Sequence, residues 1–428
     1  MRIPFILAAL ALAAAPAPAV SQASPAAAES AVRKIVRSPQ FKKAAAALDA
    51  GHDKWVEETI ALTEIPAPPF KEEARAKAYA EMFRARGLTE VEMDEVGNVL
   101  GLRKGSGSGP ILIVSAHLDT VFPEGTDVKV RREGDTLHAP GVGDDSAGLA
   151  AQLALIDALN AAGIRTRSDI LFVGTVGEEG LGDLRGVRHL FNEGRYKGRA
   201  KAFISLDGGG MDSIVTAGAG SKRYRVTFRG PGGHSYGAFG LVNPMAALAG
   251  AVSALYRIEV PTSPKTTYSA SVVGGGTSVN AIPEEVWLEV DMRSESAEAL
   301  ATLEKAFLAG VERSVAAENA ARSTKEGKIS AEAKPIGDRP AGQTPDSADI
   351  VRFATAAYKA EGIELKRTSA STDSNLPMSL GIPAVTLSRT ARSARAHAPD
   401  EWIGIEKADN VKLKRIALAT ILAVAGVR

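Results

Sequence analysis

The sequence predicts an α/β protein in which a larger domain, with a mostly parallel central sheet flanked by helices, is interrupted by a smaller inserted α+β domain. Two apolar runs, Ile111–Val114 and Ile170–Val173, are typical of buried strands in a parallel sheet. From about Ser221, polar and apolar residues alternate as in half-exposed antiparallel strands, and the α/β pattern returns after Pro335. A chain of 428 residues is also too long for a single hydrophobic core.

The N-terminus has the features of a signal peptide over residues 1–23. A short positive region precedes the uncharged apolar stretch Ile3–Ala15, and small residues at Ala17–Ala19 and Ser21–Ala23 offer cleavage positions. The apolar stretch is too short to span a bilayer comfortably, so we expect no stable membrane anchor. An exported protein, periplasmic or secreted, is the prediction. The Ala- and Lys-rich residues 24–50 are expected to form a helical, loosely attached extension.

Helices and strands alternate in the first part of the larger domain, residues 51–219. Pro66 ends the first helix, Gly87 is placed to cap the second, and Ser146 is placed to begin a third. The predicted helices are 54–64, 71–87 and 146–162, and the predicted strands are 96–102, the strand that carries His117, 169–175 and 202–206.

The inserted domain, residues 220–334, is predicted to have a β-α-β-β-α-β order, which is that of a ferredoxin-like α+β layer. The predicted elements are strand 223–228, helix 243–256, strands 267–273 and 285–292, helix 297–318 and a last strand near 328–333. The second part of the larger domain, 335–428, follows with a helix over 346–362, a strand over 384–387 and a helix over 406–425.

The composition is that of a soluble globular protein, with 45% hydrophobic and 24% charged residues. Lys and Arg total 51 against 50 Asp and Glu, so no basic face for nucleic acid is expected. The chain has no cysteine, which excludes disulfides, thiolate metal ligands and a cysteine nucleophile. With only six histidines in the sequence, each candidate imidazole is informative.

Acidic residues and one histidine follow the predicted buried strands. Because the carboxyl ends of parallel strands meet at one edge of a sheet, we expect these side chains to converge there. So many like charges need cations between them, which predicts a metal site with a second imidazole from elsewhere. His397, in a polar loop before the last helix, is the expected source. The converging residues are His117, Asp119, Asp144, Asp145, Glu178 and Glu179.

Seven short motifs, which include the residues above, occur along the chain in the same order as in a known protein family. Together they resemble the co-catalytic dizinc metallopeptidases typified by peptidase T, glutamate carboxypeptidase, aminoacylase and succinyl-diaminopimelate desuccinylase. The segment Gly177–Gly186, with the helix after it, looks most like the peptidase T branch. The resemblance runs from about residue 50 to the C-terminus. Its motifs are His117-Leu118-Asp119, Gly143-Asp144-Asp145, Glu178-Glu179, Asp207, the loop around His234, Gly276–Pro283 and His397-Ala398-Pro399-Asp400.

The resemblance implies two Zn²⁺ per chain, with Mn²⁺ or Co²⁺ as alternatives. It places His117 and Asp207 on one ion, and Glu179 and His397 on the other. Asp144 is expected to bridge both ions, with a cis peptide bond after it. Asp119 is expected to orient His117, since a spacing of two puts both on one side of a strand. Glu178 is the implied general base, taking the proton of a water held between the metals.

Three further residues are implied outside the metal cluster. The resemblance makes the inserted domain a lid and dimerisation domain, so a homodimer is expected in which His234 reaches the partner's active site. Arg293 is expected to grip a substrate carboxylate, and Asn280 to donate near the scissile carbonyl. Alternatively, Arg293 pairs with Glu295 or Glu298 and Asn280 caps a turn. The loop 371–375 lines the substrate or is a plain polar turn.

The resulting functional prediction is a zinc-dependent exopeptidase or amidohydrolase that cleaves an amide bond in short peptides or N-acyl amino acids. Aminopeptidase, carboxypeptidase, and aminoacylase or deacetylase activities stay open. An exported, metal-dependent peptide-binding protein without catalysis is a further alternative, against which Glu178 argues. A serine hydrolase lacks its Gly-x-Ser-x-Gly turn between a strand and a helix. A related dizinc aminopeptidase would lack the insertion.

Overall fold

A computed structural model describes residues 23–107 and 109–427. The predicted signal peptide falls almost wholly on residues 1–22 and so lies outside the described residues. Across the described part of the chain, no helix combines the length and the apolar character needed to cross a membrane.

The larger domain is built on a mixed sheet whose centre is parallel, as predicted. The strand order is β1-β2-β6-β3-β7-β17-β8-β15, with β16 beside β8. Strands β6, β3, β7 and β17 are parallel neighbours, whereas β1, β2, β8 and β15 pair antiparallel at the flanks. The strands are β1 (Thr89–Met93), β2 (Val99–Arg103), β3 (Ile111–His117), β6 (Ile170–Thr175), β7 (Ala200–Gly209), β8 (Ser213–Gly218), β15 (Gly342–Gln343), β16 (Lys366–Ala370) and β17 (Ala384–Thr390).

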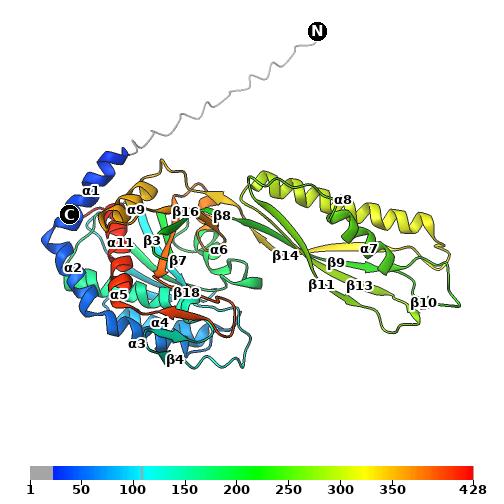
Figure 1. Ribbon diagram of the computed structural model, residues 1–428, viewed down its shortest axis with the longest axis horizontal. Coiled ribbons are helices and arrows are strands. Elements are labelled where there is room, and N and C mark those ends of the chain that lie inside the picture. The colour runs from blue at the N-terminus through cyan, green and yellow to red at the C-terminus, as the bar shows by residue number, and fades with distance from the viewer. Residues whose placement is uncertain (1–22, 108, 428) are drawn as a thin grey trace, which may run out of the picture.

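Helices cover both faces of this sheet (Figure 1). Alternate residues of β3 point to opposite faces of the sheet. Leu112 and Val114 pack into the core beneath α5, α9 and α11. Ile111 and Ile113 pack into the core on the other face, with α6 and α10. A strand buried on both sides has to be apolar throughout, which is the pattern seen in the sequence. The helices are α3 (His52–Thr63), α4 (Glu73–Ala85), α5 (Gly148–Ala161), α6 (Arg185–Asn192), α9 (Asp349–Ala360), α10 (Asn375–Ser379) and α11 (Lys407–Ala425).

Two N-terminal helices, α1 (Pro25–Arg37) and α2 (Pro39–Ala50), belong to the core rather than hanging loosely from it. Val32 of α1 and Phe41 and Leu48 of α2 are buried. Their spacing gives each helix one apolar stripe, which packs on α9, α5 and α11. The expectation of a loosely attached extension was wrong because this stripe is narrow and lies among many Ala and Lys residues.

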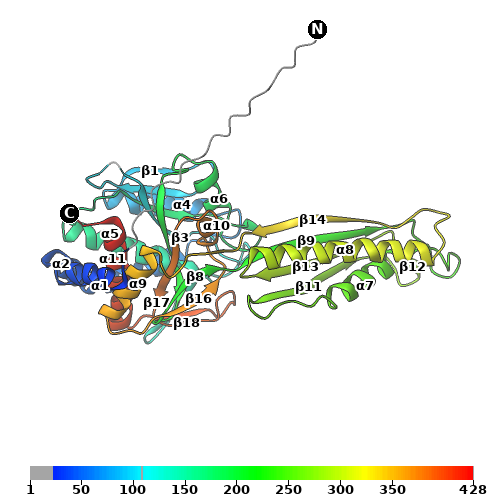
Figure 2. The ribbon, with the colours of Figure 1, turned by 90° about the horizontal axis from the view of Figure 1, so that it is seen from above.

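The inserted domain, 220–339, has its own four-stranded antiparallel sheet of order β11-β13-β9-β14. Two helices cover one face, burying Phe228, Leu248 and Phe307. The domain extends away from the larger domain (Figures 1 and 2). Its elements are β9 (Gly220–Arg229), α7 (Pro244–Leu255), β11 (Thr266–Gly275), β13 (Glu285–Ser294), α8 (Ala297–Ala321) and β14 (Ser330–Arg339). This is the expected β-α-β-β-α-β order, with a last strand that continues to Arg339.

Short strands shape the remaining loops. At the far end of the inserted domain, β10 (Gly233–His234) pairs with β12 (Ala281–Ile282). In the larger domain, a small sheet of order β18-β19-β5-β4 holds the loop before α11. Its strands are β4 (Arg131–Glu133), β5 (Thr136–His138), β18 (Ser393–Ala394) and β19 (Trp402–Gly404).

The chain enters and leaves the inserted domain at neighbouring positions. Gly218 of β8 pairs with Gly342 of β15 in the larger sheet. Ser221 of β9 pairs with Arg339 of β14 in the smaller sheet. The two connections therefore run side by side.

Candidate metal centre

Five predicted ligands come together at the carboxyl edge of the parallel strands. His117 is the last residue of β3, Asp207 lies near the end of β7, and Glu179 follows β6. Asp144 lies in the turn Val142–Ala147 that leads into α5. His397 lies between β18 and β19, with φ 67°, a left-handed conformation that residues with a side chain rarely adopt. The antiparallel pairing of β18 with β19 holds this loop at the edge of the site.

Asp144 lies between the two imidazoles. Its Oδ1 is 2.9 Å from His117 Nε2, and its Oδ2 is 3.3 Å from His397 Nε2. His397 Nε2 is also 2.7 Å from Glu179 Oε1. On the other side, His117 Nε2 is 3.8 Å from Asp207 Oδ1. Each imidazole therefore has one carboxylate of its own, Asp207 for His117 and Glu179 for His397. Both imidazoles share the carboxylate of Asp144.

This donor set fits divalent cations. His117, Asp144 and Glu179 each offer a ligand atom within 4.8 Å of the others. Burial would lower the pKa of His117, but hydrogen bonds with Asp119, Asp144 and Asp207 raise it well above its ordinary value. Hydrogen bonds with Asp144 and then Glu179 raise the pKa of His397 to about 10. A site whose charge binds protons this strongly attracts the cations that would replace them.

Asp119 supports the cluster from behind. The backbone carbonyl of Asp119 lies 3.0 Å from His117 Nδ1, closer than its carboxylate Oδ1 at 3.6 Å. The two carboxylate oxygens accept the backbone N–H groups of Glu178 and Glu179 at 3.0 and 2.8 Å. Asp119 thus orients the ring of His117 mainly through its backbone carbonyl. Its carboxylate holds the backbone of Glu178 and Glu179, which follow β6.

Two further acids, Asp145 and Glu401, hold the backbone around Asp144 and His117. The peptide bond between Asp144 and Asp145 is cis, as the resemblance implied, and Asp145 Oδ2 accepts the backbone N–H of His117 at 2.9 Å. The buried Glu401 accepts the backbone N–H groups of Gly141, Gly143 and Asp144 at 2.8–2.9 Å. Burial is the main cause that raises the pKa of Glu401 to about 7, and the negative charge of Asp144 adds to this rise.

Glu401 and two buried arginines were not predicted as site residues. Arg389 contacts both the carboxylate and the carbonyl of Asp207, and its Nη1 is 3.6 Å from Asp144 Oδ1. Arg339 contacts Glu178. Glu401 has a weak sequence signal, because it directly follows the motif His397-Ala398-Pro399-Asp400. A single arginine in a polar segment has no comparable signal, since most such residues are exposed.

Glu178 lies beside the cluster and is almost fully buried. Its Oε1 is 3.1 Å from Arg339 Nη1, so an arginine rather than an imidazole holds its carboxylate. Burial raises the pKa of Glu178 well above its ordinary value; Arg339 opposes this rise and Glu179 adds to it. The two adjacent glutamates therefore have different surroundings: Glu179 contacts an imidazole and Glu178 does not share that contact.

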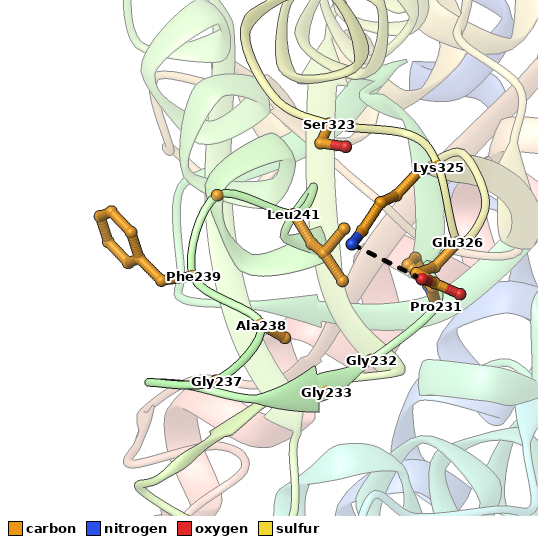
Figure 3. Close-up of a pocket in the computed structure, with 11 residues that line it drawn as sticks. Pro231, Gly232, Gly233, Gly237, Ala238, Phe239, Leu241, Ser323, Lys325 and Glu326 are labelled. Atoms are coloured by element: carbon orange, nitrogen blue, oxygen red, sulfur yellow. Dashed lines mark ion pairs between the residues drawn. The ribbon is translucent and has the colours of Figure 1, made fainter.

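His234 and Asn280 are not near the predicted metal ligands of their own chain. Both are exposed. His234 belongs to β10, which pairs with β12 at the far end of the inserted domain (Figure 2), and the carbonyl of Asn280 accepts the N–H of Ser235. A hollow beside them is formed by the glycine-rich turn 231–241 and by 323–326 (Figure 3). Figure 3 shows Phe239 pointing away from this hollow.

Arg293 lies at the opposite end of β13 from Asn280, near the larger domain. Its Nε donates to Asp291 Oδ2 at 2.7 Å. The ion-pair partner of Arg293 is therefore Asp291, and neither Glu295 nor Glu298. Asp291 Oδ1 accepts from Arg223, which also donates to the carbonyl of Gly180 at 3.1 Å. Arg293 is thus linked through two side chains to the loop after Glu179.

The loop 371–375 is largely buried and structural. Asp373 Oδ2 accepts from Thr175 Oγ1 at 2.5 Å at the end of β6, and burial raises the pKa of Asp373 to about 7. Asn375 Nδ2 donates to the carbonyls of Ala219 and Pro340, at the two connections to the inserted domain. A polar turn is the better description of this segment.

The α/β sheet, the imidazole–carboxylate cluster at its carboxyl edge and the buried glutamate beside it are those of a metal-dependent hydrolase. Residues 113–421 match the model of peptidase family M20/M25/M40, and the chain belongs to this family, whose members are peptidases and amidohydrolases. The recognition from sequence motifs is therefore confirmed.

Relatives of several activities match parts of the chain. It is 26% identical to the succinyl-diaminopimelate desuccinylase of Corynebacterium glutamicum over 242 residues, which are 55% of this chain and 64% of that protein. Identity to carboxypeptidase G2 of a Pseudomonas species is 27% over 199 residues, 46% of this chain and 47% of that one. The chain spans about a third of the length of the first curated relatives that it matches.

Among solved structures, aminopeptidase PepT from Bacillus cereus is similar with a TM-score of 0.71. Sequence identity is 22%, and the match covers 88% of this chain and 99% of that one. This likeness confirms the fold, including a main sheet and a separate smaller one.

Proposed function

We propose that this protein is a dizinc exopeptidase or amidohydrolase that cleaves an amide bond in short peptides or N-acyl amino acids. The observation that carries the proposal is Asp144, which directs one carboxylate oxygen to His117 and the other to His397. A carboxylate shared between two imidazoles suits a pair of metal ions better than one. Two imidazoles with carboxylates are ligands that zinc accepts, and manganese or cobalt are the alternatives.

In this proposal each group has a defined task. His117 and Asp207 would hold one ion, Glu179 and His397 would hold the other, and Asp144 would contact both. Two bound ions supply polarisation of the scissile carbonyl and a more acidic water. Glu178 accepts the proton of the attacking water and returns it to the leaving amine. General-base catalysis requires that such a group lies near the water, and the raised pKa of Glu178 favours proton uptake.

We expect about two metal ions per chain and metal-dependent amide hydrolysis, as a two-metal site requires. Elemental analysis of purified, zinc-loaded protein gives the stoichiometry. A screen of dipeptides, tripeptides and N-acetyl amino acids, with and without free C-termini, gives the activity. Removing the ions with a chelator should abolish hydrolysis, and adding zinc should restore it.

Glu179→Ala should lose one ion because it removes a carboxylate from the cluster. The matched control is Glu95→Ala, since Glu95 also pairs with an imidazole, His189, at 2.9 Å, but outside the site. This control should keep both ions. A single ion in the unaltered protein after zinc addition, or none, contradicts the two-metal proposal.

We further propose that the protein is a homodimer through its inserted domain. Tyr236 and Phe239, beside His234, are 90% and 82% exposed, and Val279 is fully exposed. Exposed apolar side chains on neighbouring segments of one loop region favour contact with another protein surface. In a symmetric dimer His234 of one protomer enters the site of the other and donates a hydrogen bond to the oxyanion. The distance of His234 from its own metal ligands supports this arrangement.

Mixing two inactive variants tests the shared site. A Glu178→Ala chain paired with a His234→Ala chain should regain activity, because one of the two sites in the heterodimer receives both an intact Glu178 and an intact His234. The heterodimer is isolated with two affinity tags and assayed against each parent. An isolated heterodimer without activity would place His234 in the active site of its own chain. An active His234→Ala parent would place His234 outside the chemistry.

A further inference from the structure

Arg339 is the last residue of β14 and is buried, with 5% of its side chain exposed. It contacts Glu178 at two points: Nη1 lies 3.1 Å from the carboxylate Oε1, and Nη2 contacts the backbone carbonyl. Nη1 is also 3.0 Å from Ser371 Oγ. One guanidinium therefore spans the side chain and the backbone of the same glutamate.

Such a two-point contact restricts Glu178 more than a single ion pair does. The guanidinium is planar and its N–H groups have a fixed geometry, so holding the carbonyl also fixes where the carboxylate can lie. Oε2 is not engaged by Arg339. The arrangement leaves that oxygen for the proton which Glu178 is proposed to carry.

Arg339 belongs to the inserted domain, whereas Glu178 belongs to the larger domain. Two neighbouring contacts make the same connection. The backbone N–H of Asp338 donates to the carboxylate of Asp183 at 3.1 and 3.2 Å, and Arg223 of β9 donates to the carbonyl of Gly180. The loop 178–183 is thus attached to the end of the inserted sheet at three places.

We propose that Arg339 is a positioning residue that holds Glu178 in its reactive orientation and makes that orientation depend on the placement of the inserted domain. The proposal rests on the proposed role of Glu178 as general base. Arg339 does not act on the substrate itself, so its loss should reduce turnover and leave substrate binding intact.

The test compares Arg339→Met and Arg339→Lys in the full-length, zinc-loaded enzyme with the best substrate of the screen. We expect Arg339→Met to lower kcat roughly 10-fold, a modest misplacement effect, with KM and metal content unchanged. Arg339→Lys keeps the charge and one contact, and should recover part of kcat. The matched control is Arg86→Met, because Arg86 is another buried arginine, 6% exposed, that pairs with Glu58 at 2.6 Å away from the site. The control should keep kcat.

A second pair of variants shows whether Arg339 acts through Glu178. Adding Arg339→Met to Glu178→Gln should lower kcat no further, because the residue that it positions is already disabled. An additional 10-fold loss, or a raised KM with unchanged kcat, would overturn the proposal by placing Arg339 on the substrate. Equal kcat in Arg339→Met and the unaltered enzyme would also overturn it. Full activity of Glu178→Gln would instead refute the proposed base, a separate and recognisable result.

Discussion

Replacing Glu178 by alanine is expected to lower kcat by roughly 10²-fold or more, the usual scale for the loss of a general base. The fold and both metal ions should remain, because Glu178 pairs with Arg339 and not with either imidazole of the cluster. The measurement combines steady-state kinetics with elemental analysis of the same preparation. Glu178→Gln should behave alike, since an amide cannot accept the proton.

The controls separate loss of the base from loss of a buried ion pair. Glu58→Ala removes the carboxylate of the pair with Arg86, and should cost stability with little effect on kcat. Glu179→Ala should lose an ion together with its activity. If Glu178→Ala also loses an ion, or retains full turnover, the division of roles between the two adjacent glutamates is wrong.

Amidating the C-terminus of a good di- or tripeptide substrate is expected to lower kcat/KM by about 10²-fold. The physical reason is the guanidinium of Arg293, which can bind a planar carboxylate through two parallel hydrogen bonds. A neutral amide cannot form this ion pair, and a 10²-fold loss of kcat/KM corresponds to about 3 kcal/mol. Arg293 is 45% exposed and rests on Asp291 in the free chain, so it is accessible to a substrate carboxylate.

Arg293→Ala should lower activity on the free acid and barely change activity on the amide. Arg229→Ala is the matched control, because Arg229 lies on the same sheet, pairs with Glu285 at 2.8 Å and is remote from the larger domain. Arg229→Ala should cleave the acid and the amide with the same kcat/KM values as the unaltered enzyme. Equal cleavage of acid and amide by the unaltered enzyme would make Arg293 a surface residue, and would favour an aminopeptidase that recognises the substrate's amino end.

The grouping of these imidazoles and carboxylates could be predicted because its signals are local. His117 and Glu179 come a few residues after apolar runs, and parallel strands bring the residues at their carboxyl ends to the same edge of the sheet. Asp144 precedes a helix that begins at this edge, and His397 lies in a motif with a proline and an acid. Each signal needs only a few neighbouring residues, so no knowledge of distant packing was required.

Arg339 and Arg389 could not be found in this way. Each is buried only because carboxylates from distant segments surround it, and those encounters depend on tertiary structure. The flanking strands β1 and β16 were missed for a related reason. Thr89–Met93 and Lys366–Ala370 are mostly polar, and they are strands because they pair with a neighbouring strand rather than because they form an apolar run.

Asn280 and Arg293 show a third kind of limit. Both lie near predicted strand ends, and the sequence suggests that they act on one substrate. The ten-residue strand β13 separates them, with Arg293 at the larger domain and Asn280 at the far end. Local patterns indicate that a residue is in a loop, but the end of the sheet to which the loop belongs follows from topology.

The side-by-side pairing of Gly218 with Gly342 has a consequence for how this chain is organised. Strands β8 and β15 form an antiparallel hairpin, and the whole inserted domain occupies the place of its turn. Segments added at a hairpin tip leave the pairing on either side intact, which is why such positions tolerate insertions. We therefore expect that a tight turn could close this hairpin in place of the insert, and that a differently shaped domain could be inserted there. Such an exchange would remove Arg339 together with the insert, so a transplanted insert must bring its own residue to hold Glu178.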